Sequence, residues 1–577
     1  MSDQVRGIIF VVLVLAITFV WLHFFQPPAP PQKPGPAASQ MAPAQTGASA
    51  PAPQAEQAAI AAPARPVVIP AIQASAEKSI EVESALYHVE LSNRGGVVRS
   101  WKLKKYGDDQ KKPQPLDLVN PIAAPDLGWP FSLVLSDKQL EAQVNSALYQ
   151  VSTAFLVVHE AGTPLVMPPQ DATHFDAPVN VIFHWSDGHL DVTKKLGFAQ
   201  DYQMSVEATV TLDGKPLPAA IAWRGGFGDR AVYKASQLVN VLYKQNGKLN
   251  LLQYKKLGVS GNQSEPLAQP GTVEFAGIED QFFTATFIPD GPDGTGISLW
   301  HWTQYHGSEP EAEMAAGTPN PGPLRMRVFV GPKDLALLSK VQPSLEELIN
   351  FGWTGIIAKP LLFVLQWVHK YIPNYGWAIV VFTLALTMAL LPIRIWTFHS
   401  ARKMQMVAPE IKAIQDRYKK YSMKDPRKRK MNEEVMAVYN REGINPVGSC
   451  LPMLVQLPFL WGFYRMLMGT IELRHAPWIW WIHDLSAKDP YYILPILMVV
   501  TSYFMTKMTP TPTTVDPAQQ KMMALMPVML GFIFINLSSG LNLYYFTSNL
   551  IGVVQQWYLN RAQPLPSRSK FKKKKEE

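Results

Sequence analysis

The chain has 577 residues, of which 47% are hydrophobic and 17% are charged, and its formal net charge is +8. A chain of this length usually divides into more than one packed unit, and a mean hydropathy of -0.01 means that apolar and polar segments are separated along it. Cys450 is the only cysteine, which excludes disulfides within the chain, a thiolate zinc cluster and a lipid-modified N-terminal cysteine.

The N-terminal segment predicts a membrane anchor. Ile8 to Phe25 form 18 consecutive, largely apolar positions, enough to cross a hydrocarbon core of about 30 Å. A cleaved signal peptide is the alternative, but its apolar region would span about 7 to 15 residues and end in small residues, whereas this one ends in His23 and two phenylalanines. We expect an uncleaved anchor over residues 1–26 and, because residues 27–66 are rich in Pro, Ala and Gln, a disordered linker after it.

Residues 67–343 show the period of two that is typical of half-buried strands. Apolar and polar residues alternate from Met204 to Leu212 and from Val179 to Trp185, and an Asp-Gly turn follows each run. A third run, Tyr87 to Leu91, precedes a Gly-Gly pair. These hairpin signals predict a large antiparallel β-sandwich.

The pattern becomes helical at residues 344–375, where Lys359, His369 and Lys370 interrupt apolar residues at helical spacing. The predicted apolar face consists of Trp353, Ile357, Leu361, Val364, Trp367 and Val368. Because tryptophan favours the boundary between lipid and water, we expect an amphipathic helix that lies in the membrane interface.

Five further apolar spans lie within residues 376–560. They are Gly376 to Trp396, Leu451 to Met468, Tyr491 to Met508, Met522 to Leu537 and Leu541 to Leu559. Lysine and arginine are dense from Arg394 to Arg441 and again in the tail 561–577, so the positive-inside rule places both segments in the cytoplasm. With the anchor, the sequence predicts a polytopic α-helical membrane protein of six transmembrane helices, with both termini cytoplasmic and the β-sandwich outside.

The segment 397–445 predicts a helical hairpin. Met404 to Tyr418 carries apolar residues three and four positions apart, and Met431 to Val438 carries a second such seam. A solvated strut is the alternative, but the basic tip from Lys424 to Lys430 and the methionines favour a surface that docks a charged or apolar partner.

The sequence carries no convincing catalytic signature. It lacks a phosphate-binding loop ending in Gly-Lys-Ser/Thr, and it lacks His-Glu-x-x-His and Gly-x-Ser-x-Gly. His301 and His306 with Glu309 come nearest to a metal cluster, but short clusters of this kind are usually ordinary surface or packing residues. We therefore expect no enzyme activity, no metal and no cofactor.

The order of these segments, together with local strings, resembles the YidC membrane protein insertases of Gram-negative bacteria. The strings are Asn445-Pro446-Val-Gly448-Ser-Cys450-Leu-Pro452, Gln456-Leu-Pro458, Ala476-Pro477-Trp-Ile-Trp-Trp-Ile-His483-Asp484-Leu485, Asp489-Pro-Tyr-Tyr-Ile-Leu-Pro495 and Ser539-Gly540-Leu-Asn-Leu-Tyr544-Tyr545. The resemblance covers essentially the whole chain and is strongest after Phe351, where these motifs follow one another in the family's order.

The resemblance implies an insertase and chaperone of the bacterial inner membrane that works alone or with the Sec translocon. Its C-terminal helices would enclose a polar groove, open to the cytoplasm and to lipid, that lowers the cost of bringing charge into the bilayer, about 2.5 to 3.5 kcal/mol at its centre. By motif, the substrate groove would include Thr383, Thr387, Gln456, Leu460, Met498 and Tyr545. The implied partners are nascent membrane proteins, Sec translocon components, the ribosome and membrane lipids, with no small-molecule substrate. The family's β domain also resembles the sandwich of sugar mutarotases, although a shared fold carries no activity.

One position departs from the family pattern. Bacterial members usually carry an arginine five residues before the proline that corresponds to Pro392, and this chain has Thr387 there. Arg394 is the candidate for a charge at the groove rim, with topological anchoring as its simpler role. For Thr383 and Thr387 the alternative is a hydrogen bond to the carbonyls of their own helix.

Two basic clusters are candidates for contact with the ribosome or with anionic lipid, which clustered cations suit about equally. They are Arg427, Lys428, Arg429 and Lys430 in the hairpin, and Lys572, Lys573, Lys574 and Lys575 in the tail.

Two other functions fit a multi-spanning protein with an outer domain. A secondary transporter usually shows internal repeats and ionisable residues near the middle of its spans, and the sequence shows neither. A tethered periplasmic carbohydrate-binding module would lose its function if the β domain were deleted, whereas an insertase would keep most of its activity.

Overall fold

The structure is a computed structural model that describes residues 70–108, 113–155, 172–230, 235–258, 266–290, 296–318, 321–349, 351–421, 425–443, 451–509 and 517–562. The chain divides into two compact units, Met1–Arg65 and Pro66–Glu577, and all described residues belong to the second. The predictions outside the described residues are the anchor, the linker, the hairpin tip at Lys424, the string from Asn445 to Cys450, and Lys572, Lys573, Lys574 and Lys575. The side chains of residues 155, 353, 451–457 and 517–524 are also outside the description, and Gln456 is among them.

Residues 70–332 form strands joined mainly by short turns. In chain order they are β1 Ser79–Glu83, β2 Tyr87–Ser92, β3 Val97–Gly107, β4 Pro115–Asp117, β5 Ser132–Val134, β6 Gln150–Phe155, β7 His174–Asp176, β8 Val179–Ser186, β9 Leu190–Phe198, β10 Gln203–Leu212, β11 Lys215–Pro216, β12 Ala220–Trp223, β13 Asn240–Gln245, β14 Lys248–Gln253, β15 Leu267–Ala268, β16 Phe275–Glu279, β17 Phe283–Pro289, β18 Ser298–His306, β19 Glu309–Gly317 and β20 Leu324–Pro332.

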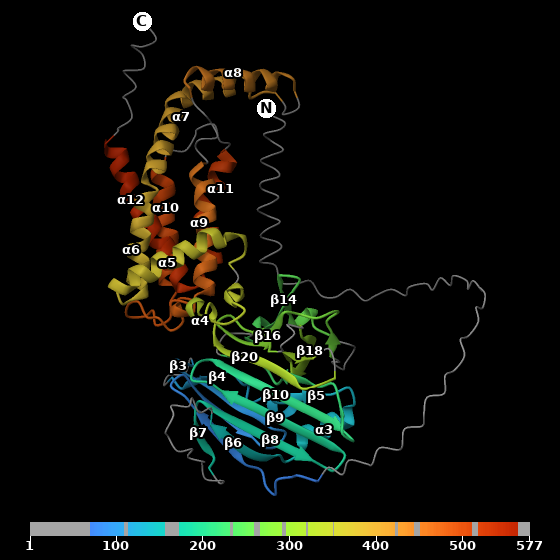
Figure 1. The fold of residues 1–577 in the computed structure, drawn as a ribbon. Helices are drawn as coiled ribbons and strands as arrows, with labels where there is room; N and C mark the ends of the chain where they lie inside the picture. Colours follow the sequence, from blue (N-terminus) through green and yellow to red (C-terminus); the bar gives the residue numbers. More distant parts are fainter. Residues whose placement is uncertain are drawn as a thin grey trace, which may run out of the picture. The chain divides into compact units, whose positions relative to one another are not determined.

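The strands build three sheets (Figure 1). The largest runs β14-β13-β16-β17-β20-β10-β9-β8-β6, with β11 paired to β10, and the other two run β4-β3-β2-β1-β7 and β15-β18-β19-β12-β5. Short helices accompany them: α2 Ala124–Leu127, α3 Lys138–Ser146, α4 Leu335–Leu338, and the 3₁₀ turns η1 Ala235–Leu238 and η2 Tyr254–Lys256. The described strands thus form the predicted β-sandwich domain.

Strand β10 shows how the alternation of apolar and polar residues determines the strands of this domain. Met204, Val206, Ala208 and Val210 are buried and alternate with half-buried polar residues, because successive side chains of a strand point to opposite faces. The turn after β10 uses Asp213 and a glycine, both with positive φ (50° and 76°), and leads into β11. The predicted hairpin is confirmed here.

One pairing differs from the predicted all-antiparallel arrangement. Strands β1 and β7 pair in parallel, with Glu81 opposite His174 and Glu83 opposite Asp176. The reason is topological: β7 reaches β1 from a distant part of the chain, whereas a tight hairpin joins antiparallel neighbours only. All other pairings between described strands are antiparallel.

The C-terminal part is helical. Its elements are the 3₁₀ turns η3 Glu346–Leu348 and η4 Gly352–Thr354, the helices α5 Gly355–Tyr371, α6 Tyr375–Ala389, α7 Leu391–Arg417, α8 Arg427–Arg441 and α9 Leu451–Gly469, the turn η6 Ile471–Leu473, and the helices α10 Ile493–Met508, α11 Pro517–Phe534 and α12 Ser539–Ala562. Helices α6, α9, α10, α11 and α12 overlap the five predicted C-terminal spans.

The predicted span from Gly376 to Trp396 is broken in two. It ends as α6 at Ala389 and resumes as α7 after a bend of 54°. Pro392 explains the break, because proline offers no N–H and disfavours helical geometry in the residue before it. By length and composition, the α6–α7 pair together could cross a membrane, and no single helix within the described residues meets the same criterion.

Helix α5 has two apolar faces, so the predicted single face is wrong. Leu361 and Val368 point inward with Ala358 and Leu365, whereas Trp367 is 52% exposed. The outward residues are Ile356, Phe363, Val364, Trp367 and Tyr371. The inner face packs against α6 and α9, and the outer face, at helical spacing, is exposed.

Helices α7 and α8 project from the other helices as a hairpin (Figure 1). The residues of the two predicted seams pack into one cluster of Met404, Val407, Ile411, Ile414, Tyr418, Met431, Val435, Met436, Val438 and Tyr439. Two ion pairs on the surface also join α7 to α8: Arg441 lies 2.7 Å from Glu410, and Arg417 lies 2.8 Å from Glu434.

Candidate functional site

The candidate site is the inner face of α12, whose polarity is inverted relative to a helix of a soluble protein. Residues at helical spacing are buried and mostly polar or small: Tyr544, Thr547, Ser548, Gly552, Gln555, Gln556 and Leu559. The opposite face is apolar and exposed, with Leu550, Val554, Trp557 and Tyr558. We name Thr547, Ser548, Gln555 and Gln556 the inner polar face. A helix that buries its polar side and exposes its apolar side suits a lipid surrounding.

Helix α10 lies against this face and shares its polarity. The Nδ2 atom of Asn549 donates to Ser502 Oγ at 2.6 Å, and Ser502 Oγ lies 3.5 Å from Met498 Sδ. Farther along, Gln556 and Asn560 donate to the carbonyl of Met508 at 3.4 and 3.1 Å. The last two bonds satisfy the carbonyl of Met508, which the end of α10 would otherwise leave unpaired.

The two predicted threonines of α6 are buried, at 0% exposure for Thr383 and 9% for Thr387. The Thr383 hydroxyl donates to Ile379 O at 2.6 Å, and the Thr387 hydroxyl donates to Thr383 O at 2.8 Å. Both therefore make the bond to their own helix that the sequence left open as the alternative. Their donors are used, and each oxygen keeps lone pairs that can accept a hydrogen bond.

Arg394 joins the first turn of α7 to α12. Its Nη1 donates to Gln555 Oε1 at 2.8 Å, and it packs over Gly552, where a Cβ atom would approach Nη1 to 2.7 Å. The remaining amide nitrogen of Gln555, Nε2, is buried and has no hydrogen-bond partner among the described residues. A cation and an unused donor therefore meet at this end of the inner polar face.

Aromatic rings hold α6, α9 and α12 together. Phe463 of α9 stacks on Phe382 of α6 at 5.6 Å between ring centroids and on Tyr544 of α12 at 4.0 Å. The predicted groove residue Tyr545 is half-buried beside Phe534 of α11 at 4.9 Å. Tyr544, its neighbour, therefore occupies the centre of the bundle.

The other predicted groove residues are spread over α9 and α10. Met498 is fully buried on α10 next to Ser502, and Leu460 is half-buried on α9 against the main core. Thr383, Thr387 and Met498 belong to helices that pack directly on α12, whereas Gln456 lies outside the described side chains.

Ser548, Gln555 and Gln556 were not predicted from the sequence. The signal was available, because Ser548 and Gln555 stand four positions before and three after Gly552 on an otherwise apolar span. Buried polar side chains at such spacing in a membrane span are costly unless they serve packing or function. Arg394 was recognised, but its partner on α12 was not.

A loop closes the end of the helices opposite the hairpin. Trp478 packs on Gly376, where a Cβ atom would meet the indole at 2.2 Å, and Gly540 N donates to Leu485 O at 2.8 Å. Asp489 starts α10 by accepting from Leu494 N at 2.7 Å. Burial raises the pKa of Glu472 in this loop, and Gln366 of α5 donates to its carboxylate at 2.8 Å.

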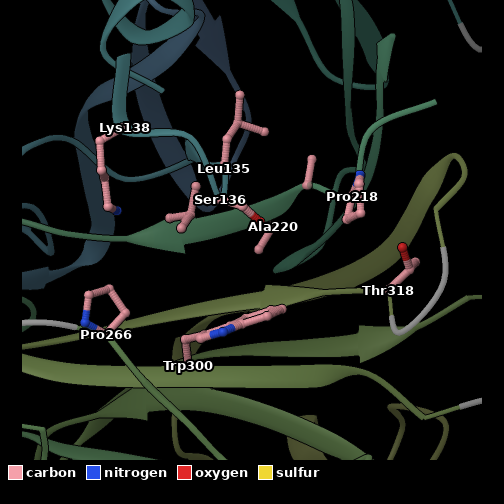
Figure 2. A pocket seen from close by; sticks show the side chains of 10 residues that line it. Leu135, Ser136, Lys138, Pro218, Ala220, Pro266, Trp300 and Thr318 are labelled. Atoms are coloured by element: carbon pink, nitrogen blue, oxygen red, sulfur yellow. The ribbon is translucent and has the colours of Figure 1, made fainter. Parts of the chain in front are cut away.

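The β-sandwich contains two other features that could have been sites. A cavity of about 340 Å³ lies beside Trp300, with Lys138, Pro218, Pro266 and Thr318 around it (Figure 2). The charged side chain that lines it, Lys138, is already paired with Glu141 at 3.0 Å.

The second feature is a set of buried carboxylates on β19. Glu311 accepts from Arg230 at 2.7 Å, and Glu313 accepts from Gly225 N at 2.9 Å. Burial raises the pKa of Glu313 to about 8. Of the two histidines that the sequence groups with Glu309, His301 is buried, and His306 lies opposite Glu309 and pairs with Asp126 at 3.2 Å. Among the described residues no group of three or more His, Cys, Asp or Glu could hold a metal ion.

The first turn of α8 carries four cationic residues, which are the predicted cluster of Arg427, Lys428, Arg429 and Lys430. Arg427 lies 4.3 Å above the ring of Tyr421 and 3.5 Å from Asp425. Positive charge at a helix N-terminus opposes the helix dipole, so these residues are not explained by helix stability.

Comparison with known proteins gives a consistent picture. Residues 367–566 match the family model described as 60Kd inner membrane protein, and residues 79–364 match the YidC periplasmic domain. The chain is 32% identical to the membrane protein insertase YidC of Geobacter metallireducens over 96% of this chain and 98% of that protein. It is 43% identical to the YidC of Geobacter sulfurreducens over 44% of this chain and 46% of that protein. A crystal structure of an active YidC insertase with its first transmembrane domain resolved is similar at 18% identity, covering 85% of this chain and 95% of that one with a TM-score of 0.35.

Proposed function

Because this chain belongs to the YidC family of membrane protein insertases, we propose that incoming hydrophobic segments enter the bilayer along the inner polar face of α12. The protein inserts nascent membrane proteins into the inner membrane, its β-sandwich is a periplasmic domain, and it is not an enzyme.

The inverted polarity of α12 is the observation that carries the proposal. Buried Ser548 and Gln555 offer hydrogen bonds to the polar backbone and side chains of a segment that has left water but has not yet formed its helix. Exposed Val554 and Trp557 on the other side suit contact with lipid. Once the segment leaves this face, burial of its apolar surface in lipid drives insertion at about 25 cal/mol per Å², so no nucleotide is needed.

Thr383, Thr387 and Met498 complete the wall opposite the inner polar face in this proposal, and Gln456, Leu460 and Tyr545 extend it. Lone pairs on the threonine oxygens accept hydrogen bonds, and Met498 supplies an adaptable apolar surface. Arg394 supplies the positive charge that Thr387 does not.

The finer topology follows from the charge pattern. We place the hairpin, Arg394 and both termini on the cytoplasmic side, and count six spans with the N-terminal anchor. The cations at the start of α8, Arg427, Lys428, Arg429 and Lys430, then face the ribosome or anionic lipid, together with the tail lysines 572–575. The outward face of α5 lies in the membrane interface, where it is also open to Sec translocon components.

Site-specific photocrosslinking tests the path. Ribosomes stalled on a short single-span substrate would be presented to full-length protein carrying a photoreactive residue at Ser548 or Thr387, with Thr209 on β10 as the control. We expect substrate adducts at both bundle positions and none at Thr209. Insertion that depends on this protein but gives no adduct at either bundle position would show that the substrate takes another route.

A further inference from the structure

Strand β14 forms one edge of the largest sheet of the β-sandwich. Among the described strands it pairs with β13 alone, and its first residue, Lys248, stands opposite Gln245. A strand at a sheet edge leaves a row of backbone N–H and C=O groups without a partner strand. The apolar residues in the middle of β14 are only half-buried, although they pack against the core: Leu249, Leu251 and Leu252.

Lysines stand at both ends of this half-exposed apolar stretch. Lys248 begins β14, and Lys255 and Lys256 follow the strand in the turn η2. All three side chains are exposed, and none of them forms an ion pair with the described residues. Lys255 Nζ lies 5.5 Å from the ring centroid of half-buried Tyr254, and tyrosine is enriched at the boundary of lipid and water. The edge is therefore apolar in the middle and cationic at both ends.

Two ion pairs connect this part of the sandwich to the segment that leads into α5. Lys244 of β13 pairs with Glu347 of η3 at 3.0 Å. The residue before it, Glu346, pairs with Lys359 of α5 at 3.4 Å. The short turn η4 is the only element between η3 and α5 among the described residues. Because the proposed position of α5 is the membrane interface, β13 and β14 stand close to the lipid headgroups of the periplasmic leaflet.

We infer that β14 and η2 rest on the periplasmic surface of the bilayer and bind the headgroups of anionic phospholipids through Lys248, Lys255 and Lys256. Each lysine near an anionic surface strengthens binding about fivefold, equivalent to about 1 kcal/mol. The half-buried leucines between the lysines meet the apolar boundary below the headgroups. This inference rests on the proposed position of α5, and it adds a second contact that sets how the β-sandwich is oriented on the membrane.

The residues of this edge suit a lipid surface better than a strand of another protein. Lysine on an edge strand opposes the addition of a second strand, and protection of the edge in this way would account for Lys248 alone. Lys255 and Lys256 lie beyond the end of the strand, where they protect no backbone group of β14. Leu251 and Leu252 are consecutive and so point to opposite faces of the sheet, and a headgroup layer can contact both without a fixed register.

Quenching of a fluorescent probe by lipid measures the contact. Full-length protein carrying Cys450→Ser would be labelled with nitrobenzoxadiazole at a single new cysteine: Asn250→Cys in β14, Phe363→Cys on the outward face of α5, or Lys215→Cys in β11. The protein is placed in nanodiscs of phosphatidylcholine, with or without phosphatidylglycerol, that contain a lipid with a nitroxide on its headgroup. We expect quenching at Asn250 to be several times stronger with phosphatidylglycerol, and high salt to remove the difference.

The probe in β11 is the control for position. Strand β11 pairs with β10, and four strands separate β10 from β14 in the sheet, which places β10 about 24 Å away. We therefore expect the probe at Lys215 to remain unquenched in both kinds of nanodisc.

Lysine variants locate the binding. The combined change Lys248→Gln, Lys255→Gln and Lys256→Gln should lower quenching at Asn250 in anionic nanodiscs to the value in neutral ones, and Lys248→Gln alone should lower it in part. Lys215→Gln is the matched control for Lys248→Gln, because it removes an exposed lysine at the far side of the same sheet and should leave the quenching unchanged. All of these side chains are exposed, so the melting temperature should stay that of wild type.

Quenching at Asn250 that is the same with and without phosphatidylglycerol, or that survives the combined lysine change, would overturn the inference. The probe at Phe363 separates this outcome from failure of the proposed position of α5. If Phe363 is quenched and Asn250 is not, α5 lies in the interface and β14 does not touch lipid. If neither is quenched, the position of α5 is itself wrong. A probe at Asn250 that is shielded from aqueous iodide but unquenched by the nitroxide lipid would assign this edge to a protein contact instead.

Discussion

Arg474, in the loop between α9 and α10, forms a buried ion pair with Asp229 of the β-sandwich, with Arg474 Nη2 2.5 Å and Nε 2.9 Å from Asp229 Oδ2. Their side chains are 3% and 7% exposed, and the guanidinium lies 5.6 Å from the ring of Phe283. Asp229 is fixed in turn, because its N–H donates to Asp280 at 2.7 Å. The periplasmic domain is therefore joined to the loop after α9 by charge as well as by packing.

Removing one partner of this pair should destabilise the protein strongly. Arg474→Met leaves Asp229 buried without its cation, which costs about 3 to 5 kcal/mol in comparable pairs, whereas a double replacement by apolar residues recovers much of the loss. Thermal unfolding of the full-length protein in detergent measures both. Arg441→Met is the control, since the exposed pair with Glu410 is worth less than about 1 kcal/mol. Equal losses for Arg474→Met and Arg441→Met would contradict this account.

Lys194 makes the stability of the β-sandwich depend on pH. It is fully buried, its Nζ donates to Phe131 O at 2.9 Å, and burial lowers its pKa to about 7. The unfolded chain has a lysine pKa of about 10.4, so between these values the unfolded state binds more protons and stability rises with pH. Lys194→Met should be more stable than wild type at pH 7 by about 2 to 3 kcal/mol, after loss of the hydrogen bond. The advantage should vanish by about pH 10.5. Melting temperatures across this range measure it, and an advantage that does not change with pH would refute the charge argument.

Glu313 should show the opposite slope. Its folded pKa of about 8 lies above the unfolded value of about 4.3, so the folded state keeps a proton that the unfolded state releases. Stability therefore falls as pH rises between these values. Glu313→Gln should match wild type near pH 4 and exceed it at pH 8 by about 3 to 5 kcal/mol. Unfolding at the two pH values decides the point. A Glu313→Gln variant less stable than wild type at pH 8 would mean that the carboxylate is ionised in the fold.

Local patterns in the sequence predict most of the elements. The alternation in β10 and its Asp-Gly turn give strand, register and hairpin together, since a strand's period is fixed by its backbone. The seams of α7 and α8 likewise meet as their spacing indicates. Helix α5 was harder: it is apolar on both sides, and spacing alone does not say which side packs against protein and which is exposed.

Contacts between residues far apart in the sequence cannot be predicted from local patterns. Asp229 and Arg474 are separated by 245 residues, and nothing local to either one indicates the other. The candidate site shows the same limit, because Arg394 was singled out as a lone cation while its position depends on Gln555, 161 residues later. Thr387 shows the opposite case, in which a local rule predicts the contact. Its hydroxyl donates to a carbonyl of its own helix, a bond that any threonine in a helix can make.

Gly376 should be intolerant of a side chain. Its Cα faces Trp478 so closely that an added Cβ would meet the indole at 2.2 Å, so Gly376→Val must displace either the start of α6 or the loop between α9 and α10. We expect a loss of about 1 to 3 kcal/mol and faster proteolysis of the loop. Gly322→Ala is the control, because an added Cβ there meets nothing within 4 Å. A Gly376→Val protein with wild-type melting temperature and loop protection would show that this contact is dispensable.

Ser548 offers the most direct functional test of the inner polar face. It is buried beside Gly552 and Gln555, so Ser548→Leu replaces a small hydrogen-bonding group with a larger apolar one where a substrate's polar groups would pass. Each unsatisfied polar group in hydrocarbon costs several kcal/mol, and the loss of one such contact should slow insertion about tenfold, equivalent to about 1.4 kcal/mol. Val554→Leu, on the 59% exposed side of the same helix, is the control and should insert at the wild-type rate. Val554→Leu should keep the wild-type melting temperature, because its side chain is exposed. Leucine at the buried position 548 also adds volume, so Ser548→Ala, which only removes the hydroxyl, should slow insertion as well. If Ser548→Leu inserts substrate as fast as Val554→Leu, polarity on this face of α12 does not limit insertion.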